Sequence, residues 1–210
     1  MIRDKRELER PFVLASASPR RRALLAALGV PFEVVVSKAE EVDEGAAPAA
    51  IVVANARAKR DDVARRIGYP AIVIAADTLV FLDEHILSKP ADAHEAKAMI
   101  HRLSGNTHQV VTGLALIDTG SGEAIEGAET TDVTFRVLSD TEIARFVEIV
   151  NPLDRAGAYT VDGPGSLLVA RYDGCYQNVL GFPMVRLDKL LREIGISLFD
   201  RMDPARASFL

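Results

Sequence analysis

Three consecutive arginines stand where a short apolar segment gives way to a helical pattern. The segment FVLASASPRRRALLAALG places Arg20, Arg21 and Arg22 directly after Ser18 and Pro19. A serine followed by a proline is typical of a helix start, where free backbone N–H groups and the positive dipole end attract phosphate. A guanidinium also binds phosphate oxygens through two parallel hydrogen bonds. The segment therefore predicts an anion site, with solvated surface arginines as the alternative.

Helix geometry limits how many of these arginines can serve one ligand. Successive residues of an α-helix are about 100° apart around the axis. At most two of the three guanidinium groups should therefore contact the same anion. The segment is neither a Walker loop nor a GxGxxG sequence, so the phosphate site is not one of those two kinds.

Three further charged residues could share this chemistry. Asp77 interrupts the apolar run AIVIAADTLVFL, and a carboxylate there is costly unless a metal, a proton transfer or hydrogen bonds use it. Lys59 falls on the apolar stripe of an expected helix, where it must reach outward or meet an anion. Lys89, before Pro90, could add positive charge, although alone it is typical of a surface lysine. Together these residues favour metal-assisted attack of water on a polyphosphate.

The remaining reactive residue types give weaker signals. The acidic segment EEVDE, from Glu40 to Glu44, could lend a carboxylate to Mg²⁺, or could be a solvated loop. The four histidines form no HExxH pattern, and no GxSxG elbow supports a catalytic triad. The single cysteine, Cys175, predicts neither an internal disulfide nor a structural zinc site.

Composition excludes several classes of protein. The chain has 210 residues, of which 49% are hydrophobic and 26% charged, as expected of a folded globular protein. Its net charge of −5 argues against broad nucleic-acid binding, which needs a basic surface. The charged N-terminus lacks the apolar stretch of a signal peptide, and no apolar run approaches the ~20 residues of a membrane span. We therefore expect a cytoplasmic protein that binds neither nucleic acid nor membrane.

Periodicity and turn signals predict a chain of intermixed helices and strands. Strands are expected at 12–15, 32–36, 71–82, 110–117, 132–137, 167–172 and 176–179. Helices are expected at 19–28, 49–67, 93–103, 140–150 and from residue 184 to about 195. Hairpin turns near Asp83 and at Asp173–Gly174 join neighbouring strands. A mixed sheet in an α/β fold follows, without the regular alternation of a Rossmann domain.

Several motifs together resemble a known family. LASASPRRRALLAALGVPFEVV, VDE, AKR around Lys59, AADTLV, LSKP, LSGNTHQVVTG, DRAGAYTVDGPG and YQNVLGFPM occur in the order and approximate spacing of the Maf family of nucleotide pyrophosphatases. The resemblance covers about residues 12 to 195. It implies an N-terminal extension, 1–11, before a single Maf-like domain, 12–210. The implied fold is a mixed sheet flanked by helices, with two lobes and a cleft, similar to the inosine triphosphate pyrophosphatases.

The resemblance also implies an activity. Members of the family hydrolyse a nucleoside triphosphate to the monophosphate and pyrophosphate, with the help of Mg²⁺ or Mn²⁺, as a house-cleaning reaction, and are typically homodimers. Asp77 resembles the family's proton acceptor and metal ligand, and Glu44 resembles its metal-associated acidic residue. The residues that resemble its phosphate-handling side chains are Ser16, Arg21, Lys59 and Lys89.

Three positions resemble the family's determinants of substrate choice. Arg20 and Thr78 match the subgroup that acts on dTTP and UTP, but Asp162 stands where that subgroup usually has glutamine. A glutamine amide both donates and accepts hydrogen bonds, whereas an ionised aspartate only accepts. The same chemistry on a purine or a methylated nucleotide such as 7-methyl-GTP is therefore an alternative. A second alternative is a regulator of septum formation or cell division that binds a nucleotide and a protein partner without turnover.

Overall fold

The computed structural model describes residues 10–42, 47–83 and 85–208. The strands are β1 (Phe12–Leu14), β2 (Phe32–Val34), β3 (Ile72–Leu82), β4 (His85–Leu87), β5 (Thr107–Asp118), β6 (Ala124–Phe135) and β7 (Val169–Asp173). The α-helices are α2 (Pro19–Ala27), α3 (Pro48–Arg66), α4 (Ala93–Leu103), α5 (Asp140–Val150), α6 (Tyr176–Val179) and α7 (Met184–Glu193). Short 3₁₀ turns are η1 (Ala156–Ala158), η2 (Gly163–Leu167) and η3 (Phe199–Arg201).

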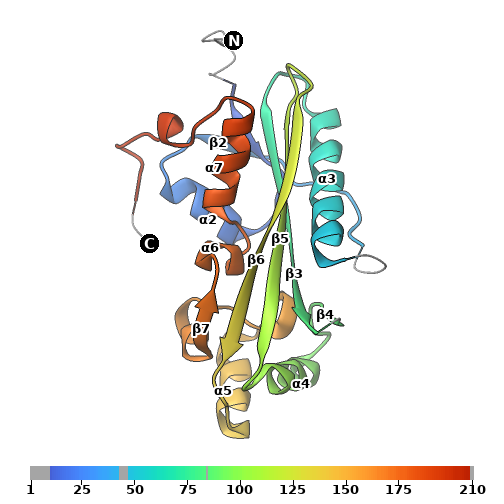
Figure 1. Ribbon diagram of the computed structural model, residues 1–210, viewed down its shortest axis with the longest axis vertical. Helices are drawn as coiled ribbons and strands as arrows, with labels where there is room; N and C mark the ends of the chain where they lie inside the picture. Colours follow the sequence, from blue (N-terminus) through green and yellow to red (C-terminus); the bar gives the residue numbers. More distant parts are fainter. Residues whose placement is uncertain (1–9, 43–46, 84, 209–210) are drawn as a thin grey trace.

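The described strands form one mixed sheet, which confirms the predicted fold class. Its order is β2-β1-β3-β5-β6-β7, with β4 paired to β3 on the same edge as β1. β1 runs parallel to β2 and to β3, and the other pairs are antiparallel. The long strands β3, β5 and β6 run through most of the length of the molecule (Figure 1).

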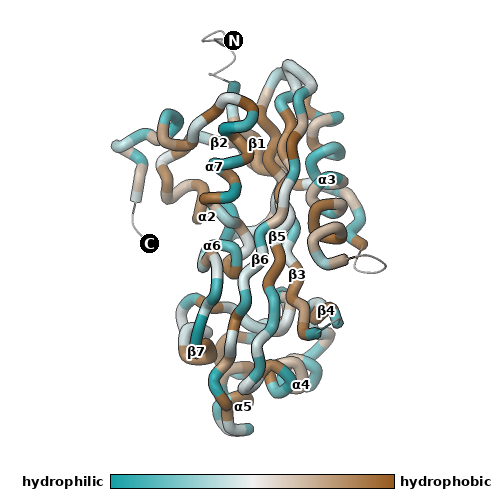
Figure 2. The backbone as a smooth tube through the Cα atoms, in the orientation of Figure 1, coloured by the Kyte–Doolittle hydropathy of each residue, from teal (hydrophilic) through white to brown (hydrophobic). Residues whose placement is uncertain are grey.

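Helices cover the sheet differently along its length. In the upper part of Figure 1, α3 packs on one face and α2 and α7 pack on the other. At the lower end, α4, α5 and the turn η1 surround a separate hydrophobic core that includes Ile100, Phe135 and Phe146. Apolar stretches recur along the strands and the helices of both parts (Figure 2), and the buried ones form the hydrophobic cores between the helices and the sheet. Two lobes therefore share one continuous sheet.

One glycine allows α3 to approach the sheet closely. Gly113 of β5 lies under Val52 of α3, and a Cβ atom there would stand 2.4 Å from the carbonyl carbon and oxygen of Val52. Any larger residue would push the helix outward. Ile51 and Val52 pack beside this contact against Leu79 and Val111 of the sheet. The close approach brings the side chains of α3 within reach of β3.

Local sequence signals explain most element boundaries. The Ser18 side chain caps α2 by accepting from the backbone N–H of Arg21, with Pro19 in the first turn. Ser139 and Glu142 form the predicted reciprocal capping box at α5. Asp92 caps α4 as expected, but the Glu95 carboxylate accepts from the N–H of Ala91 instead of completing the box. The expected helix starts are thus confirmed.

Two expected strands differ from the structure. β6 begins at Ala124 rather than near Asp132, because its polar first half gains order by pairing with β5 from Ala124 onward. The segment Tyr176–Val179, expected as a strand, is the helix α6. Its Asn178 side chain is fully buried and donates to the Val110 carbonyl and to the Thr131 hydroxyl. Those bonds hold residues 176–179 against β5 and β6, so the expected pairing of this segment with β7 does not form.

An ion pair holds the beginning of the described chain against the rest of the structure. Arg10, inside the expected extension, forms an ion pair with the buried carboxylate of Asp118. The Arg10 carbonyl also accepts a 2.7 Å hydrogen bond from Arg201. Within residues 10–42, 47–83 and 85–208, no helix is both long enough and apolar enough to cross a bilayer.

We expect Gly113→Ala to lower the free energy of unfolding by about 2 kcal/mol, because the new methyl group overpacks the contact with α3. Urea denaturation measures the change. Gly68→Ala is the matched control, because nothing lies within 4 Å of the place that its new methyl group would occupy. We expect that variant to stay within about 0.5 kcal/mol of the parent. Equal losses in the two variants would contradict the close helix approach.

Candidate active site

A gap in strand pairing along β3 creates the candidate site. β1 pairs with Ile72–Ile74 and β4 with Val80–Leu82, so in the described chain no strand covers residues 75–79 on that edge. Alternate residues of a strand point to opposite faces. Asp77 and Thr78 therefore reach this edge from the two sides of the sheet. The segments that follow β1 and β4 carry the arginines and Lys89 to the same place.

The residues around this gap enclose a cleft. It comprises two adjoining hollows of about 170 and 400 Å³, which share Arg20, Arg21, Lys59 and Lys89 as lining residues. Among the described residues that line the smaller hollow, five side chains are cationic and three are acidic. The cationic ones are Arg20, Arg21, Lys59, Lys89 and Arg155. The cleft therefore favours an anion although the whole chain is acidic.

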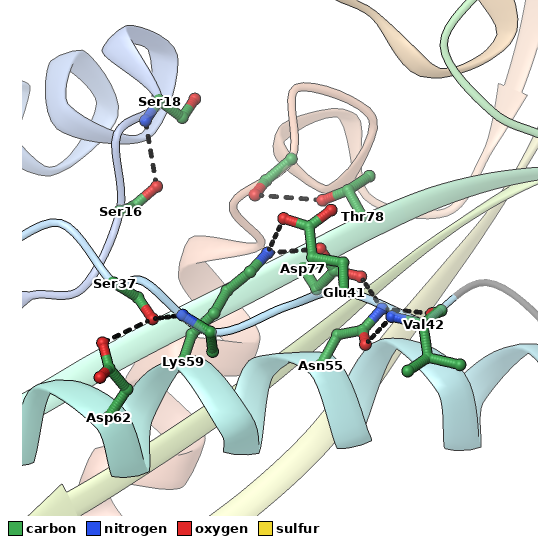
Figure 3. Close-up of polar contacts among 12 residues, drawn as sticks. Ser16, Ser18, Ser37, Glu41, Val42, Asn55, Lys59, Asp62, Asp77 and Thr78 are labelled. Atoms are coloured by element: carbon green, nitrogen blue, oxygen red, sulfur yellow. Dashed lines mark hydrogen bonds and ion pairs between the residues drawn. The ribbon is translucent and has the colours of Figure 1, made fainter.

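Asp77 lines the smaller hollow of the cleft and is almost fully buried, at 4% exposure. Lys59 donates to its Oδ1 at 2.7 Å, and Asn55 donates to its Oδ2 at 2.9 Å (Figure 3). Lys59 also forms a 2.7 Å ion pair with Glu41. An ammonium has three donors, so Lys59 keeps one hydrogen beyond these two contacts. Its position on the apolar stripe of α3 is explained by these anions.

Asn55 connects the loop that carries Glu41 to the same carboxylate. Its side-chain oxygen accepts from the N–H of Val42 at 2.9 Å, and its nitrogen donates to the Val42 carbonyl at 2.7 Å. These bonds fix the backbone next to Glu41 and bring its carboxylate to Lys59. Glu44, the predicted metal-associated residue, lies outside the described residues. Among the described residues of the acidic segment, Glu41 contacts Lys59, which also contacts Asp77.

The three arginines separate as helix geometry predicts. Arg21 is anchored by the protein: its Nε donates to the Gly181 carbonyl at 2.8 Å and its Nη2 to the Thr78 hydroxyl at 2.9 Å. Burial lowers the pKa of the Arg21 guanidinium and the Asp77 carboxylate raises it, but the group remains charged at neutral pH. Arg20 makes one long contact of 3.5 Å to Thr160. Arg22 is exposed.

The other predicted site residues lie around this centre. Ser16 is buried below the start of α2 and lies 3.5 Å from Nη1 of Arg21. Thr78 shares a hydroxyl contact of 2.9 Å with Thr112. Lys89 is exposed at the cleft and makes no hydrogen bond or ion pair within the residues that the structure describes.

Asp162 lies beside the cleft rather than in its lining. It accepts a hydrogen bond from Thr160, and its carboxylate is 4.0 Å from Arg155. Burial raises the pKa of Asp162, but the Thr160 hydrogen bond and the charges of Arg155 and Arg20 lower it more. The side chain is therefore an acceptor at neutral pH and reaches the cleft through Thr160.

Sequence reasoning missed several residues of this site. Asn55 lies one helical turn before Lys59 and shares its face, which is the signal that could have found it. Glu41 was included in the acidic segment but not selected from it. Arg155 and Tyr159 line the cleft from the segment around η1, and nothing local to that segment indicates what it faces.

Comparison with known proteins places the chain in a family. The pattern of the Maf family, described as Maf-like protein, matches residues 11–194. The chain is 46% identical to a dTTP/UTP pyrophosphatase from Alkaliphilus oremlandii, over 86% of this chain and 94% of that protein. It is 44% identical to a dTTP/UTP pyrophosphatase from Deinococcus radiodurans, over 89% and 94%. A solved Ham1 protein from Staphylococcus aureus shares 14% identity, with a TM-score of 0.44 over 60% of this chain and 72% of that chain. This last likeness carries no functional argument.

We expect Arg21→Ala to lower the free energy of unfolding by about 2 kcal/mol, because the buried Gly181 carbonyl loses a charged donor and Thr78 loses a partner. Arg22→Ala removes the same side chain from the exposed face of the same helical turn. It should change stability by less than about 0.5 kcal/mol. Denaturant titration of both variants makes the comparison, and equal losses would mean that Arg21 is not an anchor.

Proposed function

The chain belongs to the Maf-like protein family, and from that premise we propose that it hydrolyses dTTP, UTP or related pyrimidine nucleoside triphosphates to the monophosphate and pyrophosphate. The observation that supports this most is the buried Asp77 carboxylate, held between Lys59 and Asn55 inside a cleft with an excess of cations. Binding of a triphosphate requires positive charge in the cleft, and activation of the attacking water requires a base. The curated relatives named as dTTP/UTP pyrophosphatases agree with this chemistry.

In the proposed reaction Asp77 accepts a proton from water. The water oxygen bonds to the α-phosphorus, and the bond from that phosphorus to the α–β bridging oxygen breaks. The electron pair of the broken bond leaves with pyrophosphate. Both oxygens of Asp77 already accept one hydrogen bond each, but a carboxylate has about four acceptor sites, so about two remain and one of them can take the water. Lys59 and Asn55 keep the carboxylate in a single orientation.

The positive side chains neutralise charge on the phosphates. Lys59 has one remaining donor, and Lys89 and Arg20 have few protein contacts, so these three can turn toward the substrate. Arg21 contributes its charge and the remaining donors on its terminal nitrogens, because its other donors hold Gly181 and Thr78. Charge that is fixed before the reaction stabilises the developing negative charge without reorganisation.

We propose that Mg²⁺ or Mn²⁺ assists the reaction and is held by Asp77 and Glu41. No group of three or more His, Cys, Asp or Glu residues suited to a metal occurs in the part of the chain that the structure describes. Two carboxylates nevertheless fit Mg²⁺, which commonly binds one or two in addition to substrate phosphates and waters. The bound ion would neutralise phosphate charge. Glu41 is added to the proposal because its carboxylate reaches the Lys59 ammonium that Asp77 also contacts, and Glu44 stays a prediction from the family resemblance.

Substrate choice is proposed to depend on the rim formed by Arg20, Thr160 and Asp162. Asp162 only accepts hydrogen bonds, so it favours a substrate edge that donates one, such as the N3–H of uracil or thymine. The protein donors that compete for the same carboxylate are the Arg20 and Arg155 side chains. Thr78 is committed to Arg21 and Thr112, and so acts on substrate choice through Arg21. A cytoplasmic location and a homodimer stay predictions from the sequence.

The proposed base is tested by Asp77→Asn. This change should reduce pyrophosphate release by at least about a hundredfold, since an amide cannot take the proton. Pyrophosphate and phosphate are measured separately with dTTP, UTP, GTP and 7-methyl-GTP. Asp140→Asn, at a carboxylate that is 89% exposed on α5, is the control and should behave as the parent. Full activity in Asp77→Asn would reject the assignment, and tight nucleotide binding by a parent without turnover would favour the regulator.

The proposed metal ligand is tested by Glu41→Gln. Removing one of two carboxylates should raise the Mg²⁺ concentration for half-maximal activity by about tenfold or more, while excess chelator should stop the parent enzyme. Glu148→Gln, at an exposed carboxylate of α5, should leave the Mg²⁺ requirement unchanged. An unaltered requirement in Glu41→Gln would return the role to Glu44, or to Glu40.

A further inference from the structure

A buried histidine and tyrosine meet outside the charged centre of the cleft. His108 of β5 is 1% exposed and Tyr159, which follows η1, is 5% exposed. The Nε2 atom of His108 lies 2.7 Å from the Tyr159 hydroxyl. Both rings make edge-to-face contacts with Phe135, at centroid distances of 5.0 and 4.9 Å. The Tyr159 ring is therefore held in one orientation from two directions.

The backbone leading to Tyr159 needs such an anchor. Gly157 and Ala158 have φ angles of 69° and 60°, and a left-handed conformation is unfavourable for alanine. The turn sends the Tyr159 side chain into the lower core, while the next residue, Thr160, contacts Arg20 and Asp162. Tyr159 thus anchors a segment, 155–160, that contributes to the cleft lining and that the Gly157 N–H also holds by donating to the Ser88 carbonyl.

The wall around Tyr159 is apolar, although the same lining also carries the charged side chains of the cleft. Tyr159 belongs to the lower hydrophobic core, and the apolar residues of the cleft lining belong to that core or pack against it. The apolar members are Val80, Val110, Ala156, Val179 and Leu180. Such a surface suits a sugar and a base rather than phosphates.

His108 acts on the cleft through its contacts with Tyr159 rather than through charge. Burial lowers the pKa of His108 to about 4, so the ring is neutral at physiological pH and adds no charge to the cleft. Its other nitrogen, Nδ1, is buried without a hydrogen-bond partner among the described residues. Among the described residues, Tyr159 is therefore the side chain that loses a partner when the imidazole hydrogen bond is removed.

We infer that His108 is a positioning residue for the nucleoside: it holds Tyr159, and with it segment 155–160, as the wall against which the sugar and base pack. This role rests on the proposed function, because it assigns the apolar end of the same cleft. The phosphates, at the Asp77 end, do not depend on it. Loss of the hydrogen bond should weaken binding of the nucleoside part and leave binding of the triphosphate part intact.

The test compares UTP with inorganic tripolyphosphate, which occupies only the phosphate end. Tyr159→Phe and His108→Phe should each raise the KM for UTP by about tenfold, the factor that corresponds to ~1.4 kcal/mol. The kcat should change by less than about threefold, and the inhibition constant of tripolyphosphate should stay as in the parent. The double variant should resemble the single ones, because both remove the same interaction. His108→Gln, which keeps a hydrogen-bonding group, should recover part of the loss.

Tyr69→Phe is the matched control, since it removes the hydroxyl of an exposed tyrosine that bonds Glu33 away from the cleft. It should keep the parent KM. If His108→Phe does not fold, Tyr159→Phe carries the test, because it removes a single oxygen atom. Folded variants with an unchanged KM, equal losses for UTP and tripolyphosphate, or additive losses in the double variant would each overturn the positioning role. A parent that neither binds nor hydrolyses UTP would overturn the proposed function as well.

Discussion

The burial of one carboxylate governs the arrangement of this molecule. Asp77 lies in the middle of a long strand whose other residues, except Thr78, are apolar, and an ionised group without partners would be very costly there. Its compensation comes from α3, through Lys59 and Asn55, and the helix can supply both only because Gly113 lets it lie against the sheet. A buried ion pair is weak evidence for stability in itself. Here the ion pair explains how α3, β3 and the loop that carries Glu41 keep their positions relative to one another.

The interrupted edge of β3 gives that carboxylate access to a ligand. If another strand paired with residues 75–79, this edge would be closed. Side chains from only one face of the sheet could then reach a ligand. The gap admits side chains from both faces and from the segments after β1 and β4. The cleft has charged side chains around Asp77 and Lys59, and apolar side chains of the lower core around Tyr159. Both sets match parts of a nucleotide.

Local patterns in the sequence predicted the elements and the presence of an unusual Asp77 and Lys59. Caps and periodicity depend on neighbours within a few residues, so α2, α4 and α5 were found with nearly correct bounds. What failed depends on distant contacts: α6 forms because Asn178 bonds to β5 and β6, and polar β6 is ordered by its partner. The partnership of Lys59 with Asp77 and Glu41, rather than with solvent, likewise needed three separate segments. The roles that the family resemblance implied for the site residues all stay predictions: those of Ser16, Arg20, Arg21, Glu44, Lys59, Asp77, Thr78, Lys89 and Asp162.

The continuous pairing of β3 with β5, from Ile72 to Phe81, has a mechanical consequence. This ladder of hydrogen bonds is continuous beside the gap, so paired strands rather than a flexible linker join the two lobes. Widening or narrowing the cleft must bend or twist hydrogen-bonded strands along their length. A change in the width of the cleft is therefore resisted by the stiffness of the sheet, and a ligand meets walls that this ladder already holds in place.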